Sequence, residues 1–549
     1  MLEESFVPAL GSIVDVATLK EHGVEMFCTP EMDAGICASL EEKKIAKVVY
    51  MVHGRVDSVL DVGNHAMMIS RHHVPIRFYV VSISRDLSMV RRVFEEKNVL
   101  GDTQFLEIPY SWVPAGLDVV SLELQGFLKD VMVDKNMSAL YDVAIGLFQY
   151  QRMFGSAVHV QAMGAWSCRI TEMLRRMRKE AGTDVPAISD NGLDEIILID
   201  RTVDMVTPMC TQLTYEGLLD DVLGLKYGQI RSQGKKITGL DDSDPIFRET
   251  RDKLFSGARL WINSTLKEIQ KFRDVDMADA DVASLKGFVS NLREKFSRMP
   301  LHTSLLEQLG HEMKQSSFIA RQKLEAEILD DGLHMNGLYD CIYKGDDVYS
   351  VLRLMSLYCA VHGGIPKKDF DVLRKDIFNT YGFEHIATMH ALQEGNVLYK
   401  KEDRRPSAFA NAKTQMDLLV QDGSTINEEN PDDIHFAYAG YAPLSSRLIQ
   451  QACTKGWETE TKSHPTVVIA QGLDDDGYAH DAVLQHRGNL ERKKDSTRNT
   501  LVVFVGGITH AELSTLRFLS KKDKIPCNLT VGTTNILNGT TLIKSLIHS

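Results

Sequence analysis

The sequence lacks the features by which most enzymes and metal proteins are recognised. Its 549 residues include only 8 cysteines, and none stand at C-x-x-C spacing, so neither a zinc ribbon nor a thioredoxin-type redox motif is present. It contains no phosphate loop ending in Gly-Lys-Ser/Thr and no G-x-S-x-G, H-E-x-x-H or kinase-type H-R-D motif. We therefore expect no catalytic residues, no metal site and no cofactor.

The sequence also lacks an excess of positive charge and any long apolar run. Its 62 basic and 75 acidic residues give a formal net charge of -13, whereas nucleic-acid-binding proteins normally carry a basic surface, so nucleic acid is not an expected partner. No window approaches the roughly 18 apolar residues that cross a bilayer. The N-terminal stretch MLEESFVPALGS has acidic residues where a signal peptide has basic ones. We expect a cytoplasmic protein that meets membranes only indirectly.

The patterns that are present indicate an α/β fold with a large, mostly α-helical insertion. Between Lys44 and Ile108, the apolar runs KVVYMVHG, IRFYVVSISRD and QFLEIP alternate with helical segments, which is typical of a parallel sheet covered on both faces. The strand at 196–200 and the two strands near the C-terminus are too few to form separate cores, so we expect them to share one parallel sheet. The predicted domains are residues 1–150, residues 151–250 with 490–549, and a helical domain of residues 251–489.

The strand at 196–200 ends in Asp200-Arg201, and Asp204 follows. Because open α/β sheets bind ligands at the carboxyl ends of their strands, a catalytic or metal-binding carboxylate pair is one interpretation. Arg201 lies between the two acids, and the segment contains no histidine and no glycine-rich loop. We favour the alternative, in which these three residues form structural ion pairs and cap a loop.

A second candidate segment is FVGGITHAELSTLRFL, residues 504–519. Gly506-Gly507 lies between a predicted strand and a helix, where free backbone N–H groups can bind an anion. Thr509 and Glu512 have the spacing of a capping box, which explains these residues without a ligand. Whether an anion binds at the two glycines stays open at this point.

Several segments together resemble the SM (Sec/Munc) family of syntaxin-binding and SNARE-binding proteins. They are ILIDRTVDMVTPMCTQLTYEGLLDD, NPDDIHFAYAGYAPLSSRLIQ and VVFVGGITHAELSTLRFLS. The segments GYAPLSSRL and TTNILNGTTLI are most similar to the class C vacuolar protein sorting branch, which contains the SM subunit of the HOPS and CORVET tethering complexes.

The resemblance implies an arch of three domains with no catalytic activity. It implies a chaperone that templates SNARE assembly, both syntaxin-like and R-type, and so promotes fusion of endosome, lysosome or vacuole membranes. A helical hairpin of the third domain would face the SNAREs and is expected within residues 285–329. The candidate contacts are Phe288, Leu292, Arg293, Phe296, Leu305 and Leu309. For each apolar residue in this set we favour the alternative of a core position, because apolar stripes on helices usually face the core.

The resemblance also implies docking onto an α-solenoid subunit of the HOPS or CORVET complex. The corresponding stretch is 405–419, where Phe409, Ala412, Lys413 and Met416 are candidates, although Ala412 replaces the larger aliphatic residue common in the family. Two alternatives remain: a second SM paralogue type with a different solenoid partner, and a nucleotide-binding or phosphate-binding enzyme that uses the sheet edge at Asp200 and Gly507.

Overall fold

The computed structural model describes most of the chain from Lys47 onward. The described residues are 47–52, 56–71, 76–82, 87–107, 111–157, 159–182, 192–226, 228–230, 238–240, 242–273, 282–330, 335–401, 408–420, 427, 431–457, 483–487 and 498–547.

The N-terminal unit is a three-stranded parallel sheet, as the sequence predicts. Its order is β1 (Lys47–Val52), β2 (Arg77–Ser82) and β3 (Thr103–Glu107), with helices α4 (Val56–Arg71) and α5 (Leu87–Glu96) in the connections. Continuous β-branched runs suit strands buried on both faces, and this unit has its own small core that includes Phe78 and Phe94.

A seven-stranded, mostly parallel sheet forms the centre of the molecule. Its order is β11 (Val483–Arg487), β6 (His159–Met163), β7 (Glu195–Asp200), β12 (Arg498–Val505), β13 (Cys527–Thr533), β5 (Val119–Ser121) and β4 (Val113–Pro114). Strand β12 pairs in parallel with β7, with Leu501 opposite Ile196 and Val505 opposite Asp200. The prediction that the two distant apolar strands share one sheet is confirmed.

Two domain limits predicted from the sequence need correction. Strands β4 and β5 belong to the seven-stranded sheet, so the first sheet ends at Glu107 and not near residue 150. Strand β11 pairs with β6, which places residues 483–487 in the central sheet and not in the helical insertion. Strand β6, which the sequence analysis did not identify, lies between α6 (Ala139–Phe154) and α7 (Ala165–Ala181).

Helices cover the central sheet and also make up most of the insertion. Helices α19 (Leu444–Thr454) and α21 (His510–Lys521) pack on the central sheet. The other helices outside the insertion are α8 (Val206–Met209), α9 (Tyr215–Leu223) and α22 (Gly539–Ile547). The other helices of the insertion are α10 (Pro245–Thr250), α11 (Phe255–Arg273), α12 (Val282–Met313), α13 (Ser316–Leu329), α14 (Met335–Lys344), α15 (Val348–His362), α16 (Lys367–Tyr381), α17 (His385–Glu394) and α18 (Ala408–Gln415). A small antiparallel sheet lies in the chain between α9 and α10, where the helical insertion begins. It consists of β8 (Leu225–Lys226), β9 (Gln229–Ile230) and β10 (Thr238–Gly239).

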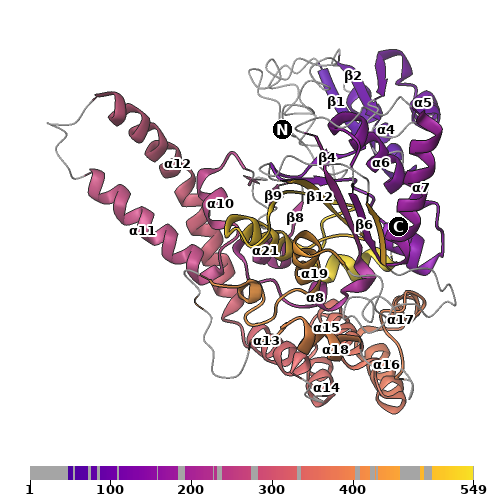
Figure 1. Cartoon of the computed structure of the whole chain (residues 1–549), viewed down its shortest axis with the longest axis vertical. Coiled ribbons are helices and arrows are strands. Elements are labelled where there is room, and N and C mark those ends of the chain that lie inside the picture. The colour runs from indigo at the N-terminus through magenta and orange to yellow at the C-terminus, as the bar shows by residue number, and fades with distance from the viewer. Residues whose placement is uncertain are drawn as a thin grey trace.

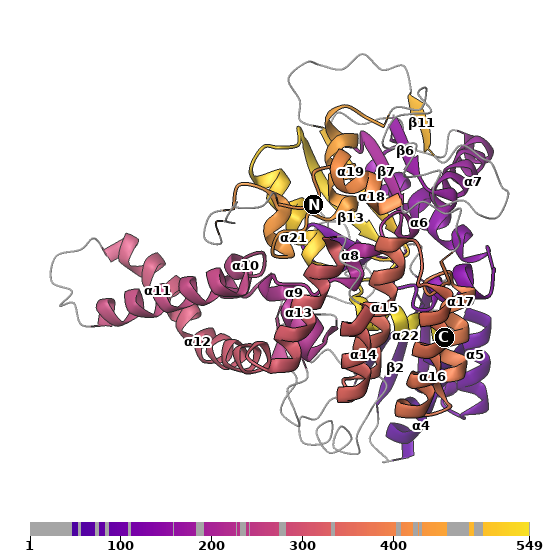
Figure 2. The same cartoon turned by 90° about the horizontal axis from the view of Figure 1, so that it is seen from below.

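Helices α11 and α12 project together from the body of the molecule (Figure 1), and the second view shows the same separation from α14 to α17 (Figure 2). The base of this hairpin has its own core, which joins it to α9, α10 and the small sheet. Helices α13 to α19 share the large core of the central sheet. Among the described helices, none is long and apolar enough to cross a bilayer.

Candidate functional site

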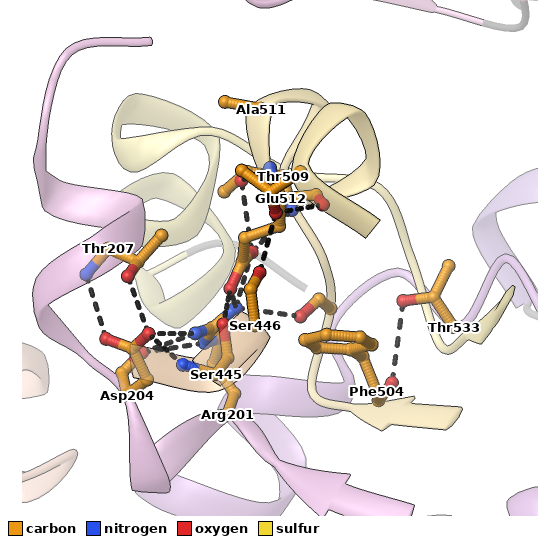
Figure 3. A network of polar contacts seen from close by, with 12 residues as sticks. Arg201, Asp204, Thr207, Ser445, Ser446, Phe504, Thr509, Ala511, Glu512 and Thr533 are labelled. Carbon is orange, nitrogen blue, oxygen red and sulfur yellow. Dashed lines mark hydrogen bonds and ion pairs between the residues drawn. The ribbon is translucent and has the colours of Figure 1, made fainter. Parts of the chain in front are cut away.

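The Asp-Arg-x-x-Asp segment lies in a buried polar junction between the central sheet and α21. The Arg201 side chain is 1% exposed, and its Nη1 donates to both carboxylate oxygens of Glu512 at 3.0 and 2.9 Å. The same guanidinium lies 3.6 Å from the carboxylate of Asp204 and donates to the carbonyl of Gly507 at 3.3 Å. Figure 3 shows the side chains of Arg201, Asp204 and Glu512 pointing toward one another, with Glu512 reaching in from α21. The predicted structural ion pairing is therefore present.

Glu512 is the acceptor at the centre of this junction. It accepts from the backbone N–H and hydroxyl of Thr509, while Thr509 Oγ1 accepts from the N–H of Glu512, which completes the predicted capping box of α21. The hydroxyl of Ser445, on α19, also donates to Glu512. One carboxylate thus ties the first turn of α21 to β7 and α19.

Asp204 has a parallel role at the start of α8. Its carboxylate accepts from the N–H of Thr207 at 3.0 Å and the hydroxyl of Thr207 at 2.5 Å, and it accepts from the N–H of Ser445 at 2.9 Å. Burial by itself lowers the pKa of Arg201, but the adjacent Glu512 and Asp204 carboxylates raise it above its ordinary value, so the guanidinium stays charged.

Asp200 has a role that the sequence did not reveal, because its partners lie more than thirty residues earlier. Its carboxylate accepts from the N–H groups of Trp166 and Ser167, each at 2.8 Å, and from the hydroxyl of Ser167. It therefore caps α7, whose own N-cap residue is Gly164 and has no side chain to do so. Gly164 has φ +101°, and a Cβ there would overlap the Asp200 side chain.

Several backbone N–H groups around the glycine pair after β12 have acceptors inside the protein. The N–H of Gly506 donates to Thr534 Oγ1, that of Thr509 donates to Glu512, and that of Ala511 donates to the side chain of Gln212. These amides already have acceptors inside the protein, so the open possibility of an anion at Gly506-Gly507 finds no support in the contacts.

A second buried ion cluster lies on the other side of α21. His510 Nδ1 is 3.3 Å from Glu216, and Arg517 pairs with Glu216, Asp118 and Asp252 at 2.8 to 3.2 Å. Burial opposes the charged forms of both partners in the His510–Glu216 pair, yet each charge stabilises the other. The pKa of His510 is consequently raised and that of Glu216 is lowered well below its usual range.

The base of the α11–α12 hairpin is held by a buried polar chain. Asp244 accepts from the N–H groups of Ile246 and Phe247 and so caps α10, and its other oxygen lies 3.1 Å from His302 Nε2. The Nδ1 of His302 is 2.9 Å from the hydroxyl of Tyr215 on α9. This chain fixes the direction in which the hairpin leaves the body.

The structure separates the predicted SNARE-contact residues into three groups. Phe296 is 55% exposed on α12, whereas Leu305 and Leu309 are buried at the hairpin base and are not available to a partner. Phe288, Leu292 and Arg293 belong to α12, but their side chains lie outside the described part of the structure. Sequence periodicity missed Leu260 on α11, which is 53% exposed.

The predicted docking helix α18 has its apolar side turned inward. Phe409 is 4% exposed, with its ring 6.1 Å from that of Tyr441, and Ala412 is fully buried, so neither residue can contact a partner. Met416 is half-buried, and Lys413 Nζ lies near the carbonyl of Leu329 and the carboxylate of Asp330. Only the opposite side of the helix, with Asn411, Thr414 and Gln415, faces outward.

No group of three histidine, cysteine or acidic side chains in the described ranges could hold a metal ion. The described part of the chain thus has two buried ion clusters, around Glu512 and around Arg517, and one projecting hairpin.

Comparison with known proteins gives consistent matches along the chain. The model of the Sec1 family matches residues 1–545. The chain is 31% identical to the vacuolar protein-sorting-associated protein 33 homolog of Arabidopsis thaliana, covering 98% of this chain and 91% of that protein. It is 26% identical to vacuolar protein sorting-associated protein 33A of Rattus norvegicus, covering 100% and 93%. A solved structure of the SM protein Vps45 in complex with the Qa SNARE Tlg2 (1-310) has the same fold, with a TM-score of 0.59 and 14% identity over 98% of this chain and 92% of that chain.

Proposed function

The chain belongs to the Sec1 family, and from this membership we propose that it is a non-enzymatic SNARE chaperone of a vesicle tethering complex. Its curated relatives are vacuolar protein sorting proteins, and the similar SM protein Vps45 was solved with a Qa SNARE. The proposed partners are a syntaxin-like SNARE, an R-type SNARE and an α-solenoid subunit of a HOPS-like or CORVET-like complex. The proposed location is the cytoplasmic face of late endosome, lysosome or vacuole membranes.

The observation that carries the proposal is the projecting α11–α12 hairpin with large apolar side chains in water. Leu260 and Phe296 are 53% and 55% exposed, one on each helix. Trp261 and Lys295 lie next to them in sequence, and the Lys295 ammonium lies 5.7 Å from the Trp261 ring centroid. A pair of exposed apolar residues with a lysine beside it suits an amphipathic helix with acidic residues beside its apolar stripe.

The physical benefit of such a surface is a lower ordering cost. An isolated SNARE motif is disordered and loses conformational entropy when it zippers with its partners. When a rigid hairpin holds two SNARE motifs in register, the motifs lose part of this entropy on binding the hairpin, before they zipper. The remaining entropy loss on zippering is then smaller, in the same way that preorganisation strengthens binding. The buried Asp244–His302–Tyr215 chain supplies the rigidity at the hairpin base.

The absence of catalysis is part of the proposal. Both oxygens of Asp200 accept hydrogen bonds from α7, and the amides near Gly506-Gly507 donate to protein acceptors. The alternative enzyme at this sheet edge would need those groups free. Isothermal titration with nucleotides and Mg²⁺ tests it, because saturable binding that Asp200→Asn abolishes would favour the enzyme.

The hairpin role is tested by retention of soluble SNARE motifs on the purified full chain. We expect Phe296→Asp and Leu260→Asp to weaken retention by about 30-fold each, which corresponds to a hot-spot loss of about 2 kcal/mol. Ile386→Asp is the matched control, because Ile386 is 50% exposed but lies on α17, away from the hairpin. Equal loss in the control, or retention unchanged by both hairpin variants, would leave only a scaffold that does not contact SNAREs.

The solenoid partner is expected on the outward face of α18. Asn411, Thr414 and Gln415 are exposed there, whereas the predicted apolar contacts are buried. Bulky replacement of Thr414 by tryptophan should release the solenoid subunit in co-purification from cells, and mass spectrometry of the bound chains identifies which complex it belongs to. If a different solenoid protein co-purifies, the second SM paralogue type is the correct branch.

A further inference from the structure

One end of the α6–α7 helix pair carries a cluster of basic residues in a chain of formal net charge -13. The cluster consists of Arg152 on α6 and of Arg175, Arg176, Arg178 and Lys179 on α7. Helix α6 leads into β6, and α7 leads toward β7, which runs parallel to β6. The C-terminal ends of both helices therefore lie at the edge of the sheet where these strands begin, and α7 is on the outside of the molecule (Figure 1).

Arg178 is the unusual member of the cluster. It follows the buried Leu174 by one helical turn and is itself half-buried, with its Nε and Nη2 atoms shielded from water. Among the described residues, neither atom has a hydrogen-bond partner. Burial lowers the pKa of this guanidinium to about 10. A shielded cation without an acceptor is costly, so the arrangement favours an anion that supplies one.

The other four basic side chains are exposed, and none has an ion pair in the part of the chain that the structure describes. Arg175 and Lys179 are four residues apart on the same helical face, a spacing at which like charges repel. Cations at a helix C-terminus are favourable for the helix dipole, which accounts for one or two of these residues but not for a half-buried guanidinium without a partner.

The compactness of the cluster points to the kind of anion. Residues 175–179 rise only about 6 Å along the helix axis, so their charges lie around the last turns of α7 and do not extend along its length. An acidic helix would be matched by bases spread along its length, whereas several phosphates on one headgroup match a compact cluster. Arginine also binds phosphate oxygens in a bidentate manner. Met153, which is 42% exposed, follows Arg152 directly and offers an apolar contact at the same end.

We propose that this α6–α7 end faces a membrane and binds a multiply phosphorylated lipid headgroup. Such a contact would orient the chain directly on the bilayer, in addition to any attachment through protein partners. The half-buried Arg178 guanidinium would hold one phosphate, and the exposed arginines and Lys179 would neutralise the remaining charge.

Vesicle co-sedimentation of the full chain tests the surface. The probes are phosphatidylcholine vesicles with phosphatidylinositol bisphosphate and vesicles of phosphatidylcholine alone. The test variant combines Arg175→Gln, Arg176→Gln and Lys179→Gln. The charge-matched control combines Lys367→Gln, Lys368→Gln and Lys375→Gln on α16, where all three lysines are exposed.

Each basic charge near an anionic bilayer raises partitioning roughly fivefold, so the test variant should bind about 100-fold more weakly while the control binds like the natural chain. Equal losses in both variants would overturn the proposal, because net charge alone would then explain binding. Failure of the natural chain to sediment with the anionic vesicles would overturn it as well.

Arg178→Met gives an independent test in which stability and binding move in opposite directions. Removing an unpartnered, half-buried charge should keep or raise the Tm in the absence of anions. Inositol hexakisphosphate should raise the Tm of the natural chain but not that of the variant. A large fall in Tm for Arg178→Met would instead assign Arg178 a structural role. Stabilisation by the free inositol phosphate without vesicle binding would assign the site to a soluble anion and overturn the membrane contact.

Discussion

Replacement of Arg201 by methionine is expected to destabilise the central sheet more than any exposed substitution. Methionine retains much of the apolar volume but removes the guanidinium that lies between the carboxylates of Glu512 and Asp204. Both acids are buried, at 0% and 2% exposure, so each becomes an uncompensated charge in the interior.

The size of the destabilisation depends on the hydrogen bonds that each carboxylate retains in the variant. Glu512 still accepts from Thr509 and Ser445, and Asp204 still accepts from Thr207 and Ser445, so the loss is the charge pair and not all solvation. Breaking a buried pair by removing one partner costs about 3 to 5 kcal/mol. That is a large fraction of the roughly 5 to 15 kcal/mol that stabilises a domain, and it corresponds to a fall in Tm on the order of 10 °C.

The assay is thermal unfolding of the purified chain by tryptophan fluorescence. Trp166 packs near Gly506 beside the junction, so its emission reports on this region. The double variant Arg201→Met with Glu512→Gln should recover at least about 1 kcal/mol relative to the sum of the single changes, because it removes one of the two orphaned charges. Arg92→Met is the control, since its pair with Glu96 is 79% and 60% exposed and contributes about 0.5 kcal/mol or less.

The reasoning would be refuted by a Tm for Arg201→Met within about 2 °C of the natural chain, which converts to less than about 1 kcal/mol. Strict additivity in the double variant would refute it too, because the two residues would then not share an interaction.

Three further outcomes are expected. His510→Gln should reduce the loss of stability that the natural chain shows as pH rises. Because the pKa of His510 is raised in the folded protein, its pairing with Glu216 stabilises the fold fully below about pH 6.5 and is lost as pH rises through the folded-state pKa. Urea unfolding midpoints measured across this pH range test the difference. Asp200→Asn should lower the free energy of unfolding by about 1 to 2 kcal/mol, since it weakens the cap of α7. Gly507→Ala should lower the free energy of unfolding by more than about 2 kcal/mol, because φ is +107° and a Cβ would overlap a leucine side chain. Gly182→Ala should lower it by about 1 kcal/mol, because φ is +58° and no other atom lies within contact of the added Cβ.

Each of these outcomes can fail in a definite way. Parallel pH profiles for His510→Gln and the natural chain would show that the ion pair does not contribute to stability. Unchanged stability in Asp200→Asn would mean that α7 does not depend on this cap. Equal costs for the two glycine changes would show that backbone conformation, and not the crowded site, sets the penalty.

The sequence could predict features that depend on residues close together in the chain, and those that follow from the need of each strand for neighbouring strands. Thr509 and Glu512 are three residues apart, so their capping box follows from spacing alone. The pairing of β7 with β12 follows because neither strand had enough neighbours to bury its faces. The resemblance to the SM family agreed with both inferences and is confirmed by the family match.

Other features could not be predicted, because helical periodicity shows which side of a helix is apolar but not what that side faces. Leu305 and Leu309 fill the hairpin base, which is the core position that we favoured, whereas Phe296 on the same helix is exposed. Phe409 and Ala412, which we expected to contact a partner, pack against the body instead. Asp200 caps α7 through Trp166 and Ser167, which lie 34 and 33 residues before it, so no local sequence pattern predicts this cap. Strand β6 was missed because its five residues sit between two long helices.

The pairing of β7 with β12 has a consequence for synthesis on the ribosome. About 300 residues must be translated between these neighbours, which takes roughly 15 to 60 s at typical rates of elongation. During that interval one long edge of β7 stays without its strand partner, and such an edge is prone to pair with other nascent chains. Chaperone dependence should therefore be strongest late in translation, and a premature stop before residue 498 should yield an insoluble product.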